Sequence, residues 1–258
     1  MYVLSVVNHK GGVGKSNVCV NLAAEVAALG LRVLAIDLDP QHTLTSWMLD
    51  FKPGVSGVAE VLGYGSQENA DPRQFIQRAE AFGCDVLPAD LEKLEVMGEQ
   101  IKADAGKVFR LADALVKLAD DYDLVVIDCR PALGSLTQVA VAASQGVIIP
   151  VNGSESLEGY AELEAFLARM KRIAPVEIIG TLLTMYRSHT RHFEEIATGL
   201  EAIGGLIPVR IGLSVDAAEL HARRVPARTH KKNGRSHKDY RDLAKFIATK
   251  LGLTGAAA

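Results

Sequence analysis

The chain has 258 residues, of which 48% are hydrophobic and 23% are charged. It is long enough for one large globular domain or two small ones, which excludes disorder as its main state. No apolar run approaches the roughly 20 residues that a membrane-spanning helix needs, and the start MYVLSVVN does not resemble a signal peptide. Three cysteines, Cys19, Cys84 and Cys129, show no CxxC spacing, so we expect small buried apolar residues and no disulfide or thiolate metal site. These features predict a soluble, cytoplasmic protein.

The net charge of −3 argues against a nucleic-acid partner when it is taken for the whole chain. The distribution of charge is uneven, however. The segment from His221 to Arg241 contains eight lysines and arginines and one acid, Asp239. A local basic segment of this kind favours either a solvated charged face or a surface for a polyanion.

Short apolar runs alternate with longer segments of helical period, which is typical of an α/β protein with a mostly parallel, twisted sheet flanked by helices on both faces. Strands are predicted at 2–7, 32–38, 84–88, 124–128, 146–151 and 177–184. Helices are predicted at 16–29, 106–119, 155–172, 190–202 and 238–250. Glycines and polar residues between 52 and 72 indicate a surface excursion and not a domain boundary. We therefore expect a single domain over residues 1–258.

The first predicted strand is followed by a glycine loop and then by a helix. The loop reads His9-Lys10-Gly11-Gly12-Val13-Gly14-Lys15-Ser16, and this context turns a P-loop match into a specific one. The glycines let backbone N–H groups curl around phosphate oxygens, and the helix N-terminus adds positive potential. Lys15 is predicted to contact the β- and γ-phosphates, and the Ser16 hydroxyl to ligate Mg²⁺. The alternative is a glycine-rich turn that binds nothing.

Two further strands end in acids. Asp37 and Asp39 close the second strand in the run Asp-Leu-Asp-Pro-Gln, and Asp128 closes the strand at 124–128. Because ligands of open α/β sheets bind at the carboxyl ends of the strands, these acids are expected to meet the glycine loop there. An Asp after four apolar residues is typical of a Walker B residue that orients Mg²⁺. Taken singly, each Asp is equally explained as a turn former or a helix cap.

These motifs resemble the deviant Walker motifs of the ParA/MinD/Soj group of P-loop ATPases, and they favour its Soj-like DNA-partitioning branch. The resemblance covers most of the chain, from Val3 to about Lys250, and it rests on KGGVGKS, DLDPQ, VVIDCRPALG, TMYRSHT at 184–190 and LIPVRIGLS at 206–214. It implies an Mg²⁺-dependent ATPase of weak intrinsic activity. It also implies an ATP-sandwich homodimer that binds nonspecific double-stranded DNA near the nucleoid and is released when a ParB-like adaptor stimulates hydrolysis.

The resemblance also implies roles for individual residues. Lys10 reaches the phosphates of the partner protomer, and Asp39 positions or activates the hydrolytic water, so that Lys10, Lys15 and Asp39 are the catalytic residues. Ser16, Asp37 and Asp128 are the implied magnesium-site residues, and Asp37 is either a neighbour of the metal or a structural support. The implied nucleotide-binding set is Lys10, Gly11, Gly12, Val13, Gly14, Lys15, Ser16, Asn17, Met185 and Pro208.

The chain departs from the pattern of this group at four places. The group has Thr-Thr after the loop lysine, where this chain has Ser16-Asn17. Serine keeps the metal-binding hydroxyl, whereas Asn17 stands in place of the threonine that is expected to contact the α-phosphate. Arg130 stands in place of the first proline of IDxPP. In the motif TMYDxRT, Arg187 and His189 replace the acid and the arginine. We also see no N-terminal extension that would hold an operator-binding helix-turn-helix, so autoregulation is not expected.

The basic segment is the predicted DNA surface, with Arg187, Arg191 and Arg210 as neighbours. It has no recognition-helix signature and no aromatic interleaving except Tyr240, so it is expected to contact phosphates without reading sequence. The predicted DNA-binding residues are Arg187, Arg210, Arg223, Arg224, Arg228, Lys231, Lys232 and Arg235.

Two alternative functions remain at this point. A MinD-like membrane-associated ATPase would use the apolar stripe of Tyr240, Leu243, Phe246, Ile247 and Leu251, which core packing explains more simply. The terminal LGLTGAAA also lacks bulky apolar and basic residues, so we expect no membrane partner. A metabolic P-loop ATPase or ligase is the other alternative, although no second-substrate constellation supports it. A reductase-type iron–sulfur ATPase is disfavoured by the cysteine spacing.

Overall fold

The computed structural model describes residues 1–66, 70–153, 159–187, 191–202, 205–213 and 216–253. Within these residues, eight strands form one sheet in the order β3-β4-β2-β5-β1-β6-β7-β8. The described pairs are parallel except for β3, which runs antiparallel to β4. The strands are β1 Tyr2–Val6, β2 Val33–Leu38, β3 Gln77–Ala79, β4 Cys84–Leu87, β5 Leu124–Cys129, β6 Gly146–Val151, β7 Glu177–Tyr186 and β8 Leu206–Gly212.

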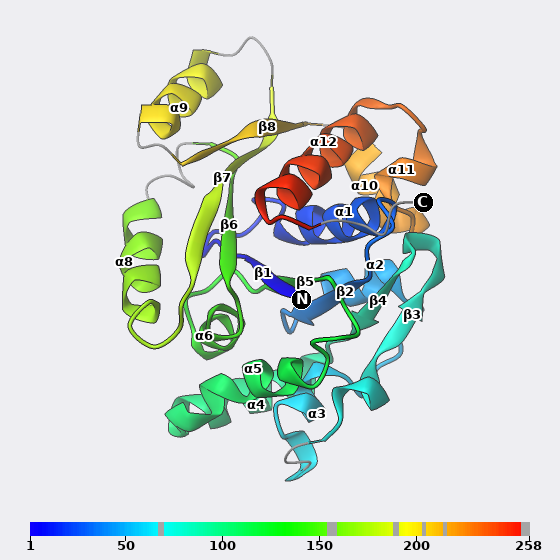
Figure 1. Cartoon of the computed structure of the whole chain (residues 1–258), viewed down its shortest axis with the longest axis vertical. Helices are drawn as coiled ribbons and strands as arrows, with labels where there is room; N and C mark the ends of the chain where they lie inside the picture. Colours follow the sequence, from blue (N-terminus) through cyan, green and yellow to red (C-terminus); the bar gives the residue numbers. More distant parts are fainter. Residues whose placement is uncertain (67–69, 154–158, 188–190, 203–204, 214–215, 254–258) are drawn as a thin grey trace.

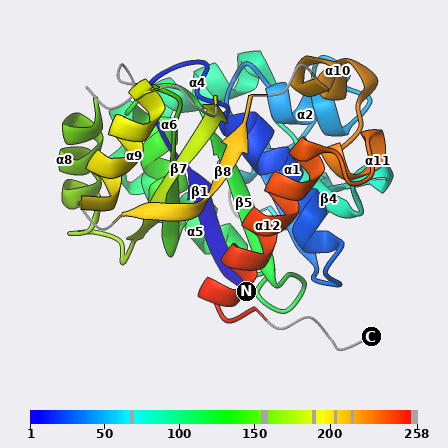
Figure 2. The same cartoon turned by 90° about the horizontal axis from the view of Figure 1, so that it is seen from above.

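Helices cover both faces of the sheet (Figures 1 and 2). One face carries α1 Lys15–Ala27, α2 Thr43–Met48, α10 Asp216–Arg223, α11 Ala227–His230 and α12 Arg235–Lys250. The other carries α3 Val58–Val61, α4 Leu91–Ala103, α5 Arg110–Val116, α6 Ser135–Ala142, α8 Tyr160–Met170 and α9 Arg191–Ala202. Short 3-10 helices lie at η1 Tyr64–Ser66, η2 Pro72–Phe75, η3 Glu80–Phe82 and η4 Ala105–Phe109.

The central strands are apolar on both faces and so supply two hydrophobic clusters. In β1, Val3 joins the cluster under α4 to α9, whereas Leu4 and Val6 join the cluster under α1 and α12. In β5, Val125 and Val126 divide in the same way. Alternation of side chains along each strand places successive residues on opposite faces. The uniform apolar runs in the sequence therefore reflect strands that are buried on both sides, and the predicted fold class is confirmed.

Some sequence predictions need correction. The segment 52–72 is not only a surface excursion, because the four residues of α3 within it are buried. The helix predicted at 106–119 is the 3-10 helix η4 followed by α5, which ends at Val116. The helix predicted at 238–250 already begins at Arg235. Residues 155–158 of the helix predicted at 155–172 lie outside the described residues.

The apolar stripe of α12 packs inside the protein. Tyr240, Leu243 and Ile247 are buried in the cluster that also contains the apolar face of α1. The three cysteines are also buried and free, as expected. Within the described residues, no helix is both long and apolar enough to cross a membrane. The stripe therefore belongs to the core, which removes the feature that suggested a membrane-binding surface.

Candidate nucleotide-binding site

The loop between β1 and α1 has the backbone of a phosphate cradle. Gly12 and Gly14 have φ values of 72° and 84°, in the left-handed region that glycine adopts without strain. The loop is anchored from neighbouring strands. The Thr184 hydroxyl donates to the Val13 carbonyl at 2.8 Å, and the Asn152 amide donates to the Gly12 carbonyl at 3.2 Å. These anchors hold the loop open in front of the N-terminus of α1.

Lys15 begins α1 and is buried at the centre of this loop. Its side chain donates from Nζ to the Lys10 carbonyl at 3.0 Å, and only 7% of the residue is exposed. Burial lowers the pKa of the Lys15 ammonium, and the nearby Asp128 carboxyl opposes that shift. The arrangement keeps the Lys15 amine in a poorly solvated position beside the glycine loop.

Asp128 ends the apolar part of β5 and is completely buried. Its Cα is the register partner of Val6 in β1 and of Asp37 in β2, so the three strand ends meet at one edge of the sheet. Burial and the nearby Asp37 raise the pKa of Asp128 to about 8, while Ser16 and Lys15 oppose the shift. Neither carboxyl oxygen has a hydrogen-bond partner of standard geometry among the described residues.

The unpaired carboxyl oxygens beside Ser16 fit a hydrated divalent cation that is also held by phosphate. Oxygen ligands suit Mg²⁺, which keeps several waters and binds through few protein groups. Among the described residues, no three His, Cys, Asp or Glu side chains cluster into a metal cage. The site thus offers the Ser16 hydroxyl and the Asp128 carboxyl to a cation, and a bound nucleotide would supply further oxygen ligands.

Asp37 occupies a different environment from Asp128. One of its oxygens accepts from the Asp39 N–H at 3.1 Å, and the other accepts from both the N–H and the hydroxyl of Thr45 at 2.8 Å. The Thr45 hydroxyl in turn accepts from the Ala89 N–H at 2.9 Å. Burial raises the pKa of Asp37 to about 7, and the bonds from Thr45 oppose this. These contacts favour a structural role for Asp37 over a role beside the metal, because they link β2, α2 and the end of β4.

Asp39 lies two residues beyond and opens toward the loop. Its carboxylate accepts from the Gln41 N–H at 3.1 Å, and 9% of the residue is exposed. It lines an open cavity of about 540 Å³ together with the glycine loop. The described residues around this cavity are Gly11, Gly12, Gly14, Lys15, Ser16, Asn17, Asp39, Gln41, Thr43, Trp47, Pro131, Met185 and His221.

Most of the residues predicted to bind nucleotide line this cavity, and three of them do not. Val13 is buried. The Lys10 side chain is not part of the wall, although its backbone receives Lys15. Pro208 is exposed in β8, and the register pairs of β7 and β8 place it about three residues below the level of Met185. The prediction that Pro208 contacts the nucleotide is therefore not supported by its position, because the strand ends only at Gly212.

Several residues of the cavity were missed by sequence reasoning. Trp47 and His221 form a wall together, with ring centroids 5.3 Å apart, and come from α2 and α10. Asn152 and Thr184 anchor the loop from the ends of β6 and β7. Thr184 is the first residue of the motif TMYRSHT, and this motif could have identified it as a residue of the site. Trp47 and Asn152 had no signal, because their relevance depends on contacts between distant segments.

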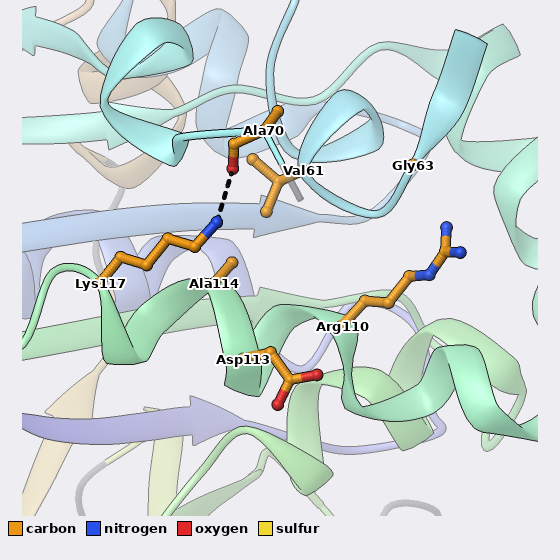
Figure 3. A pocket seen from close by; sticks show the side chains of 7 residues that line it. All are labelled: Val61, Gly63, Ala70, Arg110, Asp113, Ala114 and Lys117. Atoms are coloured by element: carbon orange, nitrogen blue, oxygen red, sulfur yellow. Dashed lines mark hydrogen bonds between the residues drawn. The ribbon is translucent and has the colours of Figure 1, made fainter. Parts of the chain in front are cut away.

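A much smaller cavity of about 90 Å³ lies between α3 and α5 (Figure 3). Arg110 donates to the Leu62 carbonyl at 2.7 Å, and Lys117 donates to the Ala70 carbonyl at 3.4 Å. Both cations are thus engaged with backbone groups of the 58–75 region. This cavity is explained by the attachment of that region to α5.

The predicted DNA-binding residues fall into two groups. Arg210 is held on β8 by the Tyr186 hydroxyl at 3.1 Å and by Glu194 at 3.6 Å, which leaves less of its charge for a phosphate. Arg187 is exposed at the end of β7. The other group follows α10, α11 and the start of α12 and consists of Arg223, Arg224, Arg228, Lys231, Lys232 and Arg235. The Arg191 side chain and His189 lie outside the described residues.

Acids partly neutralise this second group. Arg224 pairs with Asp50 at 2.8 Å, while Arg223 and Arg235 have looser contacts of 3.9 Å with acids one helical turn away. Lys231 and Lys232 are exposed between α11 and α12. Because exposed ion pairs contribute little and exchange readily for other partners, the segment still presents a basic surface.

A strand, a glycine loop with a buried lysine, and acids at the ends of two neighbouring strands define a P-loop nucleoside triphosphatase. Comparison with known proteins supports this class and narrows it. The model of a family described as "AAA domain" matches residues 1–177. The sporulation initiation inhibitor protein Soj of Bacillus subtilis is 32% identical over 256 residues, which cover 95% of this chain and 98% of Soj.

A chromosome-partitioning ATPase Soj from Thermus thermophilus is 35% identical over 202 residues, covering 77% of this chain and 75% of that protein. A solved cobyrinic acid a,c-diamide synthase from Mycobacterium smegmatis, with a bound ATP analogue and magnesium, has a TM-score of 0.80 at 27% identity. It covers 100% of this chain, and the match spans 99% of the synthase. The chain belongs to the Soj/ParA family of partitioning ATPases within the ParA/MinD superfamily.

Proposed function

We propose that this protein is an ATP-driven DNA-partitioning switch. Two protomers sandwich ATP and Mg²⁺, the dimer holds nonspecific double-stranded DNA, and adaptor-stimulated hydrolysis releases it. The observation that carries the proposal is that Lys15, Ser16 and Asp39 line one open cavity and that the buried Asp128 carboxyl lies close to Ser16 and Lys15. Membership of a partitioning ATPase family supports the biological role.

The nucleotide would lie with its phosphates in the glycine loop. Backbone N–H groups of Gly11 to Gly14 would face the phosphate oxygens, and Lys15 would exchange its bond to the Lys10 carbonyl for the terminal phosphates. Ser16 and Asp128 would hold Mg²⁺, which neutralises charge on the β- and γ-phosphates when it is bound. Met185 would contact the nucleotide from the end of β7.

Hydrolysis requires a group that orients water at the γ-phosphate. Asp39 lies on the cavity wall, and one of its oxygens is fixed by the Gln41 N–H. Its other oxygen has no hydrogen bond among the described residues and is available to a water molecule. This geometry supports the role of Asp39 in positioning the hydrolytic water.

We infer that Lys10 acts on the nucleotide of a second protomer. Its N–H donates to Asn8 at 2.9 Å and its carbonyl receives Lys15, so its backbone is fixed while its side chain lies outside the cavity wall. A cation outside the wall of its own cavity suits contact with phosphates across a dimer interface. This arrangement supports an ATP-dependent homodimer.

The basic segment would hold DNA through phosphate contacts. Its cations come from α10, α11 and the start of α12, next to the nucleotide cavity that His221 helps to line. Contacts to phosphate alone predict binding that is indifferent to sequence and weakened by salt. The protein would accordingly be associated with the nucleoid in the cytoplasm, with a ParB-like adaptor as its second partner.

A metabolic ATP-dependent ligase is the second candidate, because the diamide synthase shares the fold over the full chain at 27% identity. ATP-dependent retention on DNA distinguishes the two functions, since a metabolic ligase has no need to bind DNA. Flotation with liposomes tests the MinD-like alternative, for which the buried α12 stripe leaves no support in the described residues.

The experiment is fluorescence anisotropy with two unrelated DNA duplexes, each measured with ATP and with ADP at several salt concentrations. We expect equal affinity for both duplexes with ATP, little binding with ADP, and a slope of log K against log salt of about −0.9 for each phosphate contact. A strong preference for one duplex, or equal binding with ADP, contradicts the proposal.

A further inference from the structure

Asn17 lies between the nucleotide cavity and α12. It lines the cavity near the start of α1, and its Oδ1 accepts from the Tyr240 hydroxyl at 2.6 Å and from the Asn21 amide at 2.8 Å. Two donors on Oδ1 fix the orientation of the Asn17 amide. No hydrogen bond in the described part of the chain uses Asn17 Nδ2, so this donor is available to an acceptor in the cavity.

Asn21 extends the same connection to α11. Its Oδ1 accepts from the Ala227 N–H at 2.8 Å, while its Nδ2 also donates to the Asn17 carbonyl at 2.9 Å. Asn21 and Tyr240 are both buried. Buried hydrogen bonds of this kind are costly to break, because the groups left behind cannot turn to water.

The two helices held in this way carry the basic segment. Arg228 lies on α11, Lys231 and Lys232 lie between the helices, and Arg235 begins α12. Figure 1 shows α11 and α12 beside α1 at the same face of the sheet. Two bonded side chains therefore join the wall of the nucleotide cavity to the elements that present the cations.

We propose that Tyr240 is a positioning residue that makes DNA affinity depend on bound ATP. Without nucleotide the Asn17 amide is bonded only through Oδ1 among the described residues. A phosphate oxygen of the nucleotide that accepts from Nδ2 adds a contact at the other end of the amide, which strengthens the hold of Oδ1 on the Tyr240 hydroxyl. This contact holds α12, and Asn21 holds α11, so that the basic segment takes one position. The inference rests on the proposed function and names the contact through which that function is regulated.

The test uses Tyr240→Phe, which removes only the hydroxyl. Its matched control is Tyr122→Phe, since Tyr122 is also buried and its hydroxyl donates to Asp85 at 2.9 Å, away from the residues that line the cavity. For each full-length variant, anisotropy gives the ratio of the DNA dissociation constants without nucleotide and with saturating ATP. Calorimetry gives the ATP affinity with and without DNA.

We expect the ratio to fall about fivefold in Tyr240→Phe, the effect of one net hydrogen bond, and to stay at the wild-type value in Tyr122→Phe. Because coupling between two ligands is reciprocal, the tightening of ATP binding by DNA should fall by the same factor. ATP affinity without DNA should change less than about twofold. Thermal unfolding of each variant identifies a general loss of structure.

Asn17→Ala provides a second variant. If Tyr240 acts through Asn17, then Tyr240→Phe should have no further effect on the ratio in the Asn17→Ala background. Additive losses, an unchanged ratio in Tyr240→Phe, or an equal loss in Tyr122→Phe would overturn the coupling alone. If DNA affinity of the wild-type protein does not respond to ATP, the proposed function fails and the coupling fails with it.

Discussion

Lys15 illustrates how one residue depends on its surroundings for its chemistry. A lysine with only 7% of its surface exposed needs polar partners, and in this structure its Nζ donates to the Lys10 carbonyl and lies near Asp128. Phosphate oxygens would replace the carbonyl with full negative charge, which makes a much stronger partner. Under the proposed function, the bond to Lys10 would be the resting arrangement of Lys15, which it exchanges for phosphate when nucleotide binds.

Lys15→Ala should abolish ATP binding, because it removes the buried cation that offsets phosphate charge. Calorimetry with ATP and Mg²⁺ measures this directly, and we expect an affinity at least about 100-fold weaker. Lys102→Ala is a suitable control, since Lys102 is exposed on α4 and pairs with Glu99. An unchanged affinity in Lys15→Ala would contradict the assignment of the glycine loop.

Asp39→Ala should bind ATP and Mg²⁺ normally and lose hydrolysis by about 100-fold or more. Orienting water is a task of the transition state and adds nothing to binding of the ground state. Phosphate release and calorimetry on the same variant separate the two effects, and the ATP dimer should accumulate. A loss of affinity as severe as that of Lys15→Ala would place Asp39 in the binding shell instead.

The pKa values of the buried acids predict a pH dependence of stability for the ligand-free protein. Burial and Asp37 raise the pKa of Asp128 to about 8, so its carboxyl is neutral in the folded state where the unfolded chain is already ionised. The stability it supports is complete below about pH 4 and is lost as the pH rises toward 8. Asp37, with a pKa of about 7, acts in the same direction.

Asp128→Asn should therefore stabilise the ligand-free protein, and more so at high pH. We expect the gain in melting temperature to be at least about 3 °C larger at pH 8 than at pH 5. Differential scanning calorimetry without nucleotide or metal gives both values. A gain that is independent of pH would show that the carboxyl is already ionised in the folded protein at pH 5.

At the scale of elements, the strands that position the loop were predictable and the contacts between distant segments were not. Uniform apolar runs identified β1, β2, β5, β6 and β7, because strands buried on both faces need them. β3 has three residues and lies at an edge, and β8 is interrupted by Pro208, so neither forms such a run.

The candidate site divides along the same line. Lys15, Ser16, Asp39 and Asp128 could be proposed as site residues because each lies at or beyond the end of an apolar run with a recognisable pattern. The bonds of Asp37 to Thr45 and of Asn17 to Tyr240 could not, since their partners follow no fixed spacing and lie 8 and 223 residues away. Such pairs are set by packing of the folded chain, which local patterns do not encode.

The turn between α11 and α12 belongs to the same scale. Replacing Lys231, Lys232 and Arg235 with alanine should weaken ATP-dependent binding to all duplexes alike and flatten the salt slope by up to about 0.9 for each lost contact. Anisotropy at several salt concentrations measures the slope. The double variant Lys102→Ala, Lys107→Ala serves as the control, because both lysines lie on the other face of the sheet from α11 and α12. An unchanged slope, or loss of the ATP dimer, would exclude this surface.

At the scale of the whole molecule, the sheet separates two hydrophobic clusters that differ in what they support. The cluster under α1 and α12 supports the helices next to the cavity at the glycine loop and the basic segment, whereas the cluster under α4 to α9 supports neither. The cavity opens at the carboxyl edge of the sheet between them. A second protomer that meets this edge would close both nucleotide sites at once.

Lys10→Ala should bind ATP with near-normal affinity as a monomer but fail to dimerise and to hydrolyse ATP. A cation supplied across the interface contributes only once the interface has formed. Sedimentation velocity with ATP should show a monomer where the wild-type protein shows a dimer. A dimer of normal affinity in Lys10→Ala would refute the contact between protomers, and Lys15→Ala supplies the comparison that loses ATP itself.

The two ends of the sheet bear on how the protein avoids unwanted assembly. An edge strand with a free row of backbone donors and acceptors invites another chain to add to it, as in amyloid growth. Here one edge is the three-residue β3, and the other, β8, carries the exposed Pro208, which has no N–H to donate. Both edges are poor templates for strand addition. The proposed dimer would therefore have to form away from the two edge strands, through surfaces built from loops and helices.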